Sequence, residues 1–138
     1  MQRNKEIGSE FWFDFEPKDI ACNSQEILVL SGRTAIDVIL KDILKSRKIR
    51  NVYLPAYCCD SMIDPFIRNG IDVKLYDIDF DGGLQYLIDE DTETDIFYVN
   101  NYFGYENTIS NKIIEHFKHK GAIIIYDKTH SLFMTNDA

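Results

Sequence analysis

The sequence predicts an α/β domain with a mostly parallel sheet and helices on both faces. From Glu26 onward, short apolar runs rich in β-branched residues alternate with longer stretches of helical periodicity, the pattern of parallel α/β folds. One of those runs, at 122–126, is apolar on both faces, which is typical of a central strand in a covered sheet. The chain has 138 residues, of which 45% are hydrophobic and 28% charged, so it suits one globular domain with a sizeable core.

Two strand–helix units are predicted in the first half of the chain. A strand is expected at 27–30, and the turn Ser31-Gly32-Arg33-Thr34 then opens a helix with helical spacing of its apolar residues. These residues are Ile36, Ile39, Leu40, Ile43 and Leu44. A second strand at 51–54 stops at Pro55, and the helix that follows it ends at Asn69-Gly70, a typical C-cap.

The second half continues the alternation. Further strands are predicted at 73–76, 96–99 and 122–126, with a third helix at 109–117. The stretch 77–95 is rich in Asp and Glu and is interpreted as a solvated connection between strands. Residues 1–24 are expected to form an N-terminal arm whose aromatic side chains pack on this domain or on a partner subunit.

Charge and hydropathy argue against several classes of function. Twenty-three acidic against 15 basic residues give a formal charge of −8, which disfavours binding to nucleic acid or to an anionic membrane surface. The apolar runs are far shorter than the roughly 20 residues that span a bilayer, and the N-terminus does not resemble a secretory signal. Cys22, Cys58 and Cys59 lack metal-type spacing, which predicts no metal site and favours a reducing, cytoplasmic setting.

Candidate functional residues follow the predicted strands, because open α/β sheets bind ligands outside the carboxyl ends of their strands. After the first strand, Ser31-Gly32-Arg33-Thr34 combines a glycine with the free N–H groups of a helix N-terminus, which favours an anion. An ordinary N-cap by Ser31 or Thr34 is the simpler interpretation of this motif taken alone. After the fifth strand, Asp127 supplies a carboxylate, for which capping of the following turn is the alternative.

Other polar or aromatic side chains follow the second, fourth and fifth strands: Tyr57, Cys58, Cys59, Asn100, Asn101 and His130. A nucleophilic thiol would need a base, and His130 is the one plausible candidate. Buried structural cysteine is the commoner case, so a Cys/His nucleophile is the less favoured interpretation.

Taken in order, these segments resemble the N-terminal part of the DegT-like family of sugar aminotransferases, which are fold-type I enzymes dependent on pyridoxal 5′-phosphate. The matching segments are 31–36, 52–57, 70–79, 102–104 and 124–130, and 6–11 resembles the start of the family. The resemblance implies that 25–138 form part of the large domain of such an enzyme. It also implies that the complete enzyme would transfer an amino group to a keto-sugar nucleotide.

The resemblance assigns roles to the residues after the first and fifth strands. Gly32, Arg33 and Thr34 would bind the cofactor phosphate at the helix N-terminus. Asp127 would pair with the protonated pyridine nitrogen, which keeps the ring cationic and able to act as an electron sink. His130 would lie near the phenolic oxygen of the ring or orient Asp127.

The residues after the second and fourth strands receive roles in the same way. Asn100 or Asn101 would reach the phenolic oxygen. The position of the family's stacking aromatic residue corresponds to Cys59, with Tyr57 two residues earlier, so the ring-stacking contact departs from the family pattern.

Family members attach the cofactor to a lysine well downstream of the strand-end aspartate. The sequence ends at Ala138, eleven residues beyond Asp127, and Lys128 should point away from the ring that Asp127 contacts. We therefore expect this chain alone not to catalyse transamination. Unpaired sheet edges and the dimeric active sites of the family predict a homo-oligomer. A non-catalytic binding or assembly domain on the same scaffold is the alternative function.

Overall fold

The computed structural model describes residues 27–104 and 108–130. The predicted arm at 1–24, which includes Cys22 and the segment 6–11, lies outside the described residues. The elements in chain order are α1 (Gly32–Ser46), β1 (Asn51–Pro55), α2 (Asp60–Arg68), β2 (Asp72–Asp79), β3 (Gln85–Leu87), β4 (Ile96–Asn100), a 3-10 turn (Tyr102–Gly104), α3 (Thr108–His119) and β5 (Ile123–Asp127).

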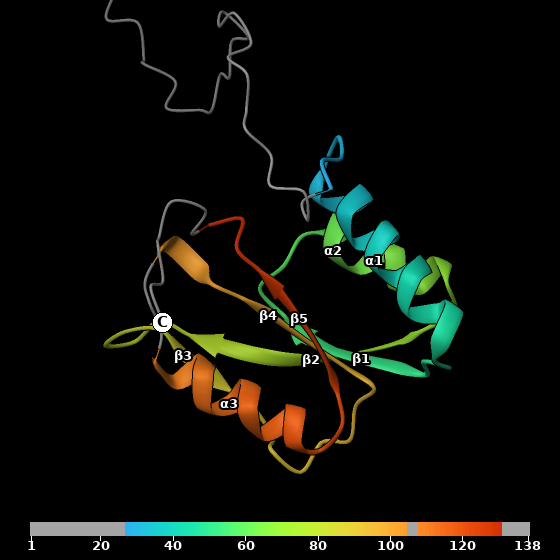
Figure 1. Cartoon of the computed structure of the whole chain (residues 1–138). Helices are drawn as coiled ribbons and strands as arrows, with labels where there is room; N and C mark the ends of the chain where they lie inside the picture. The colour runs from blue at the N-terminus through green and yellow to red at the C-terminus, as the bar shows by residue number, and fades with distance from the viewer. Residues whose placement is uncertain (1–26, 105–107, 131–138) are drawn as a thin grey trace, which may run out of the picture.

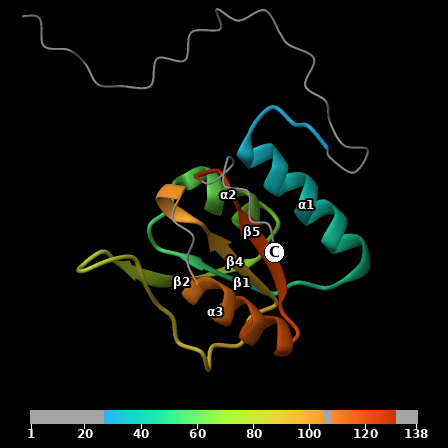
Figure 2. The ribbon, with the colours of Figure 1, turned by 60° about the vertical axis from the view of Figure 1, so that its left-hand side comes forward.

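The strands form one five-stranded sheet in the order β3-β2-β1-β4-β5. Strands β2, β1, β4 and β5 are parallel, and β3 pairs antiparallel with β2. Helices α1 and α2 lie on one face and α3 on the other (Figures 1 and 2). The predicted α/β class, with a mostly parallel sheet covered on both faces, is confirmed.

Each face of the sheet has its own apolar cluster, because successive strand residues point to opposite sides. Val52 and Leu54 of β1 pack with Leu40 of α1 and Phe66 of α2 in one cluster. Tyr53, between them, belongs to the other cluster, where the rings of Phe97 and Phe117 stack at 4.1 Å between centroids. The two clusters hold α1 and α2 on one face of the sheet and α3 on the other.

The prediction of a strand at 27–30 is wrong. These residues have no strand assignment, and Ile27 is 76% and Leu30 101% exposed. A strand is stabilised mainly by its ladder of hydrogen bonds, and the described residues place no strand beside this segment.

Two further details of the sheet differ from the prediction. The run at 122–126 forms β5 at an edge of the described sheet, whereas the fully buried strand is β4. The acidic stretch 77–95 contains the short strand β3, whose hairpin with β2 turns at Gly82 and Gly83, both with positive φ. The apolar composition of 122–126 therefore did not show which strand lies at the centre of the sheet.

The amino ends of β1 and β4 are joined by a closed polar network. Asp95 accepts hydrogen bonds from the Arg50 backbone N–H at 2.7 Å and from two guanidinium nitrogens at 3.3 Å. Its own N–H donates to Asn51 Oδ1 at 3.0 Å, and its carbonyl accepts from the N–H of Ile123 at 2.9 Å. The hydrogen bond from the Arg50 side chain is the largest of the effects that lower the pKa of Asp95.

Within the part of the chain that the structure describes, no helix is long and apolar enough to cross a membrane.

Candidate functional site

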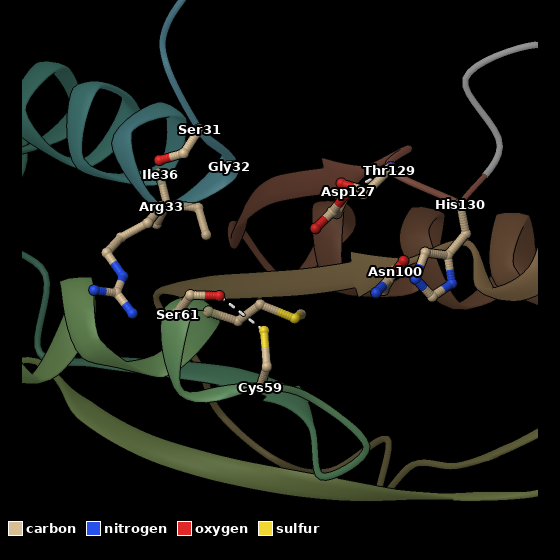
Figure 3. A pocket seen from close by; sticks show the side chains of 11 residues that line it. Ser31, Gly32, Arg33, Ile36, Cys59, Ser61, Asn100, Asp127, Thr129 and His130 are labelled. Atoms are coloured by element: carbon tan, nitrogen blue, oxygen red, sulfur yellow. Dashed lines mark hydrogen bonds between the residues drawn. The ribbon is translucent and has the colours of Figure 1, made fainter. Parts of the chain in front are cut away.

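A pocket of about 470 Å³ opens at the carboxyl end of the sheet, close to the point where the chain connections diverge (Figure 3). Strand β1 continues through α2 on one face to β2, whereas β4 continues through α3 on the other face to β5. Such a switch point leaves a crevice, which is where open α/β sheets bind ligands. The pocket is lined by Ser31, Gly32, Arg33, Ile36, Cys59, Ser61, Met62, Asn100, Asp127, Thr129 and His130.

The first wall of the pocket is the N-terminus of α1. Ser31 is the N-cap: its Oγ accepts from the N–H of Thr34 at 3.2 Å, and its carbonyl accepts from the N–H of Ala35 at 2.9 Å. The N–H groups of Gly32 and Arg33 have no such partner among the described residues, as expected for the first turn of a helix. The N-cap interpretation is confirmed for Ser31, and two donors remain for an anion.

Gly32 leaves open space on this wall. It is not among the glycines with positive φ, so its backbone conformation does not require glycine. A Cβ built at this position would meet no atom within 4 Å, other than those of its chain neighbours and its own helix. A side chain here would therefore extend into space that a ligand can occupy.

The side chain of Arg33 extends toward α2 and away from Asp127 (Figure 3). Its Nη1 lies 3.9 Å from Asp64 Oδ2, and Asp64 also pairs with Arg68 Nε at 3.5 Å. Both partners of the first pair are about half exposed, so this contact holds the guanidinium weakly. Arg33 is thus free to turn toward an anion at the helix N-terminus.

The opposite wall carries Asp127, whose carboxylate is held by three donors. Tyr98 Oη donates to Oδ2 at 2.6 Å, and both the N–H and the hydroxyl of Thr129 donate to Oδ1. Burial is the first cause, and Asp127 itself the second, of a raised pKa at Tyr98, which therefore remains a donor. The carboxylate is fixed in orientation and keeps lone pairs for a further donor from the pocket.

Asn100 stands beside Asp127 in the register of β4 and β5. Its side chain is 3% exposed and lines the pocket, but its Oδ1 has no hydrogen-bond partner in the described structure. Asn101 is equally buried with an unpartnered Oδ1, yet it does not line the pocket. Residues 98 and 100 share a face of β4, whereas residue 101 follows the end of the strand.

A second hollow adjoins the first and shares Cys59, Met62, Asn100 and His130 with it. Tyr57 lines this second hollow and not the first. Its ring contacts those of Phe80, Tyr102 and Phe103, with centroid distances between 5.5 and 6.4 Å. Tyr57 is therefore part of an aromatic cluster beside the pocket.

His130 lines both hollows, at the boundary between them. Its Nδ1 accepts from the N–H of Phe103 at 3.3 Å, so the neutral ring carries its proton on Nε2. Phe103 itself has a φ of 57°, the left-handed region that non-glycine residues rarely adopt. Within the described ranges no hydrogen bond joins His130 to Cys59, so a Cys/His pair of the predicted kind is not formed.

Cys59 lies at the N-terminus of α2, where it is the N-cap residue. Its Sγ is 2.8 Å from Ser61 Oγ (Figure 3). Cys58, its neighbour, packs partly buried against the cluster beneath α1 and α2. The two adjacent thiols therefore occupy different environments.

The structure gathers six of the predicted site residues in the first pocket: Gly32, Arg33, Cys59, Asn100, Asp127 and His130. Thr34, Tyr57 and Asn101 lie outside its lining. Sequence reasoning missed Tyr98 and Thr129 as the groups that hold Asp127, and Ser61 as the partner of Cys59. Tyr98 lies two residues before Asn100 and therefore on the same face of the strand, which the sequence could have indicated. The register of β4 against β5 was needed to place Tyr98 beside Asp127.

The described residues contain no cluster of three or more His, Cys, Asp or Glu side chains that could hold a metal ion. Comparisons with protein-family models, with curated proteins and with solved structures found no match to the chain.

Proposed function

We propose that this chain supplies the phosphate- and pyridine-binding part of a pyridoxal 5′-phosphate site, in an aminotransferase that acts on keto-sugar nucleotides. The observation that carries the proposal is the convergence on one pocket of the free N–H groups of α1 and the oriented carboxylate of Asp127. These groups suit a ligand with an anion at one end and a protonated ring nitrogen at the other.

The residues present fit that cofactor in three respects. Space beside Gly32 accommodates a phosphate close to the helix N-terminus, and Arg33 adds a cation. Asp127 offers its carboxylate to the pyridinium N–H. The side-chain amide of Asn100 lines the pocket, and its Nδ2 can donate to the phenolic oxygen of the ring. When bound, the cofactor supplies an electron sink for charge that develops at the substrate Cα.

The protein's own contribution is binding and orientation. Tyr98 and Thr129 hold Asp127 so that its carboxylate stays aligned without rearrangement when a cation arrives. Asp127 in turn keeps the proton on the ring nitrogen by charge pairing. His130 lines the pocket on the same side as Asp127.

A non-catalytic binding domain is the second candidate, and the position of Lys128 favours it. Lys128 does not line the pocket, and its Nζ lies 5.6 Å from the centroid of the Tyr126 ring. No described lysine lines the pocket, so none is placed to bond covalently to a ligand there.

An absorbance titration with pyridoxal 5′-phosphate tests the proposal, with pyridoxal, which lacks the phosphate, as the matched ligand. We expect a saturable spectral change for the phosphate ester, at least about tenfold weaker binding for pyridoxal, and loss of the change in Asp127→Asn. Lys128→Ala serves as the control and should behave as the wild type.

Equal responses to the two ligands, or no saturable change, would refute the site. Borohydride reduction and intact mass then separate the two candidate functions. Saturable binding without a covalent adduct favours the non-catalytic domain, whereas one adduct on a single lysine favours catalysis.

A further inference from the structure

We propose that Cys59 is a modification site, at which small hydroperoxides entering the pocket oxidise the thiol to a sulfenic acid. The inference concerns the thiol itself and holds whichever ligand the pocket binds.

The position of Cys59 gives its sulfur both access and a favourable local field. The residue is exposed, lines both hollows, and is the N-cap of α2, a helix of nine residues. The N-terminal end of a helix carries partial positive charge, which favours a thiolate. Ser61, two residues on, places its hydroxyl 2.8 Å from the sulfur and can donate to it.

The pKa values of the two adjacent thiols are shifted in opposite directions. The hydrogen bond from Ser61 is the main cause of a lowered pKa at Cys59, and backbone N–H groups of the first helical turn add to it. Burial raises the pKa of Cys58. Because the thiolate is the nucleophile, Cys59 should be the reactive member of the pair and Cys58 the inert one.

Asn100 provides an independent indication that a small polar molecule binds here. Its side chain is 3% exposed and its Oδ1 lacks a partner among the described residues, although it lines the same two hollows as Cys59. A buried acceptor of this kind is costly unless a donor reaches it. The O–H of a hydroperoxide is such a donor.

The charged groups around the sulfur come from three elements. Arg33 of α1, Asp127 at the end of β5 and His130 beyond it line the pocket with Cys59, and Asp60 follows Cys59 in α2. The cation of Arg33 and the helix N-terminus favour the thiolate, whereas the two carboxylates oppose it. The hydrogen bond from Ser61 is the closest of these influences.

The reaction balances without a further reagent. The Cys59 thiolate attacks one oxygen of the hydroperoxide, an S–O bond forms, and the O–O bond breaks. The sulfur loses two electrons, and the leaving oxygen takes a proton to become water or an alcohol.

The test uses the full chain in two matched variants. Cys22→Ser/Cys58→Ser keeps only Cys59, and Cys22→Ser/Cys59→Ser keeps only Cys58. Each is treated with hydrogen peroxide in the presence of dimedone, which traps sulfenic acid, and adduct formation is followed by intact mass. We expect Cys59 to form the adduct at least about tenfold faster than Cys58 at pH 7.

Adding Ser61→Ala to the Cys59-only variant should slow the reaction and move the pH midpoint of iodoacetamide alkylation upward. Peptide mapping of the wild-type chain after the same treatment gives the ratio of the two sites if a variant fails to fold. Equal labelling of both cysteines, faster labelling of Cys58, or no effect of Ser61→Ala on the midpoint would overturn the proposal.

Discussion

The polar groups at the two ends of the sheet differ in their hydrogen bonding. At the amino ends, Asp95 and Asn51 are joined to Arg50 and to β5 by hydrogen bonds that the chain supplies itself. At the carboxyl ends, Asn100 and Asn101 are as buried as core residues, yet each has an Oδ1 without a partner among the described residues. The left-handed backbone of Phe103 lies at the same end.

The amino-end groups stabilise the fold, whereas Asn100, which lines the pocket, is available to a ligand. A buried acceptor left without a donor costs roughly 1–3 kcal/mol, so a fold retains one where something else provides the donor. Substitution of polar groups at the amino end should therefore lower the free energy of unfolding more than substitution at the carboxyl end, and substitution at the carboxyl end should weaken binding more.

The largest loss of stability is expected for Asp95→Ala. The change removes the acceptor of the Arg50 N–H and the ion pair at once, and should lower the free energy of unfolding by about 2 kcal/mol. Urea denaturation measures it. Asp91→Ala, in the neighbouring connection, is the control and should change stability by less than about 0.5 kcal/mol. Equal effects of the two changes would mean that the amino-end network does not stabilise the fold.

The stabilisation from Asp95 should depend on pH. Its pKa in the folded chain is lowered, first by the hydrogen bond from Arg50, so its contribution is complete above the unfolded value of about 3.9 and is lost as pH falls through the folded value. Wild type and Asp95→Asn should therefore differ most above pH 4 and converge below it in urea titrations. A difference that grows toward low pH would contradict this sign.

Ser31→Ala should lower the free energy of unfolding by about 1 kcal/mol, because it removes the side-chain cap of α1. Ser46→Ala, at the other end of the same helix, removes only an exposed hydrogen bond to the Ile43 carbonyl and should cost less. Thermal unfolding of both variants measures the difference. If Ser46→Ala is the more damaging change, Ser31 is not the cap that positions the free N–H groups.

Asn100→Leu should change the free energy of unfolding by no more than about 1 kcal/mol, although the residue is almost fully buried. The substitution replaces an amide whose Oδ1 has no partner in the described structure by an apolar group of similar size, and it also removes the hydrogen bond between the amide and Tyr102. Binding of pyridoxal 5′-phosphate should weaken in the same variant. A loss of stability as large as that of Asp95→Ala would show that Asn100 serves the fold.

The smallest expected effect is a gain in the free energy of unfolding. Cys59 is the N-cap of α2, but its sulfur is a weaker acceptor for the N–H groups of the first turn than the hydroxyl of serine, a preferred N-cap. Cys59→Ser should stabilise the chain by about 0.5 kcal/mol in urea denaturation. Cys58→Ser places a hydroxyl in a partly apolar site and should be neutral or destabilising. If Cys59→Ser and Cys58→Ser change the free energy of unfolding in the same direction, the N-cap of α2 is not the cause of the gain.

Local signals in the sequence predicted the elements well. The helix after Ser31 and the strand before Asp127 occur where hydrophobic periodicity and strand-end residues indicated them. The segment 27–30 has the composition of a strand but is not one, because pairing depends on a neighbouring strand that composition cannot reveal.

The site was predictable only in part, for a similar reason. Gly32 and Asp127 were identified because ligands bind at the carboxyl ends of parallel strands. The choice of Asn100 over Asn101, and the support of Asp127 by Tyr98, depend on the register of β4 against β5. Register is a long-range property, and a shift of one residue would reverse which side chains face the pocket.

The most direct test of the difference between the two ends is the thermal shift that pyridoxal 5′-phosphate produces in wild type, Asp127→Asn and Asp95→Asn, with pyridoxal at the same concentration as the matched ligand. A ligand that binds only the folded chain raises Tm, so we predict an increase of several degrees in wild type and in Asp95→Asn, none in Asp127→Asn, and a clearly smaller one with pyridoxal. An equal increase in all three proteins, or an increase lost in Asp95→Asn and kept in Asp127→Asn, would contradict the assignment of binding to the carboxyl end.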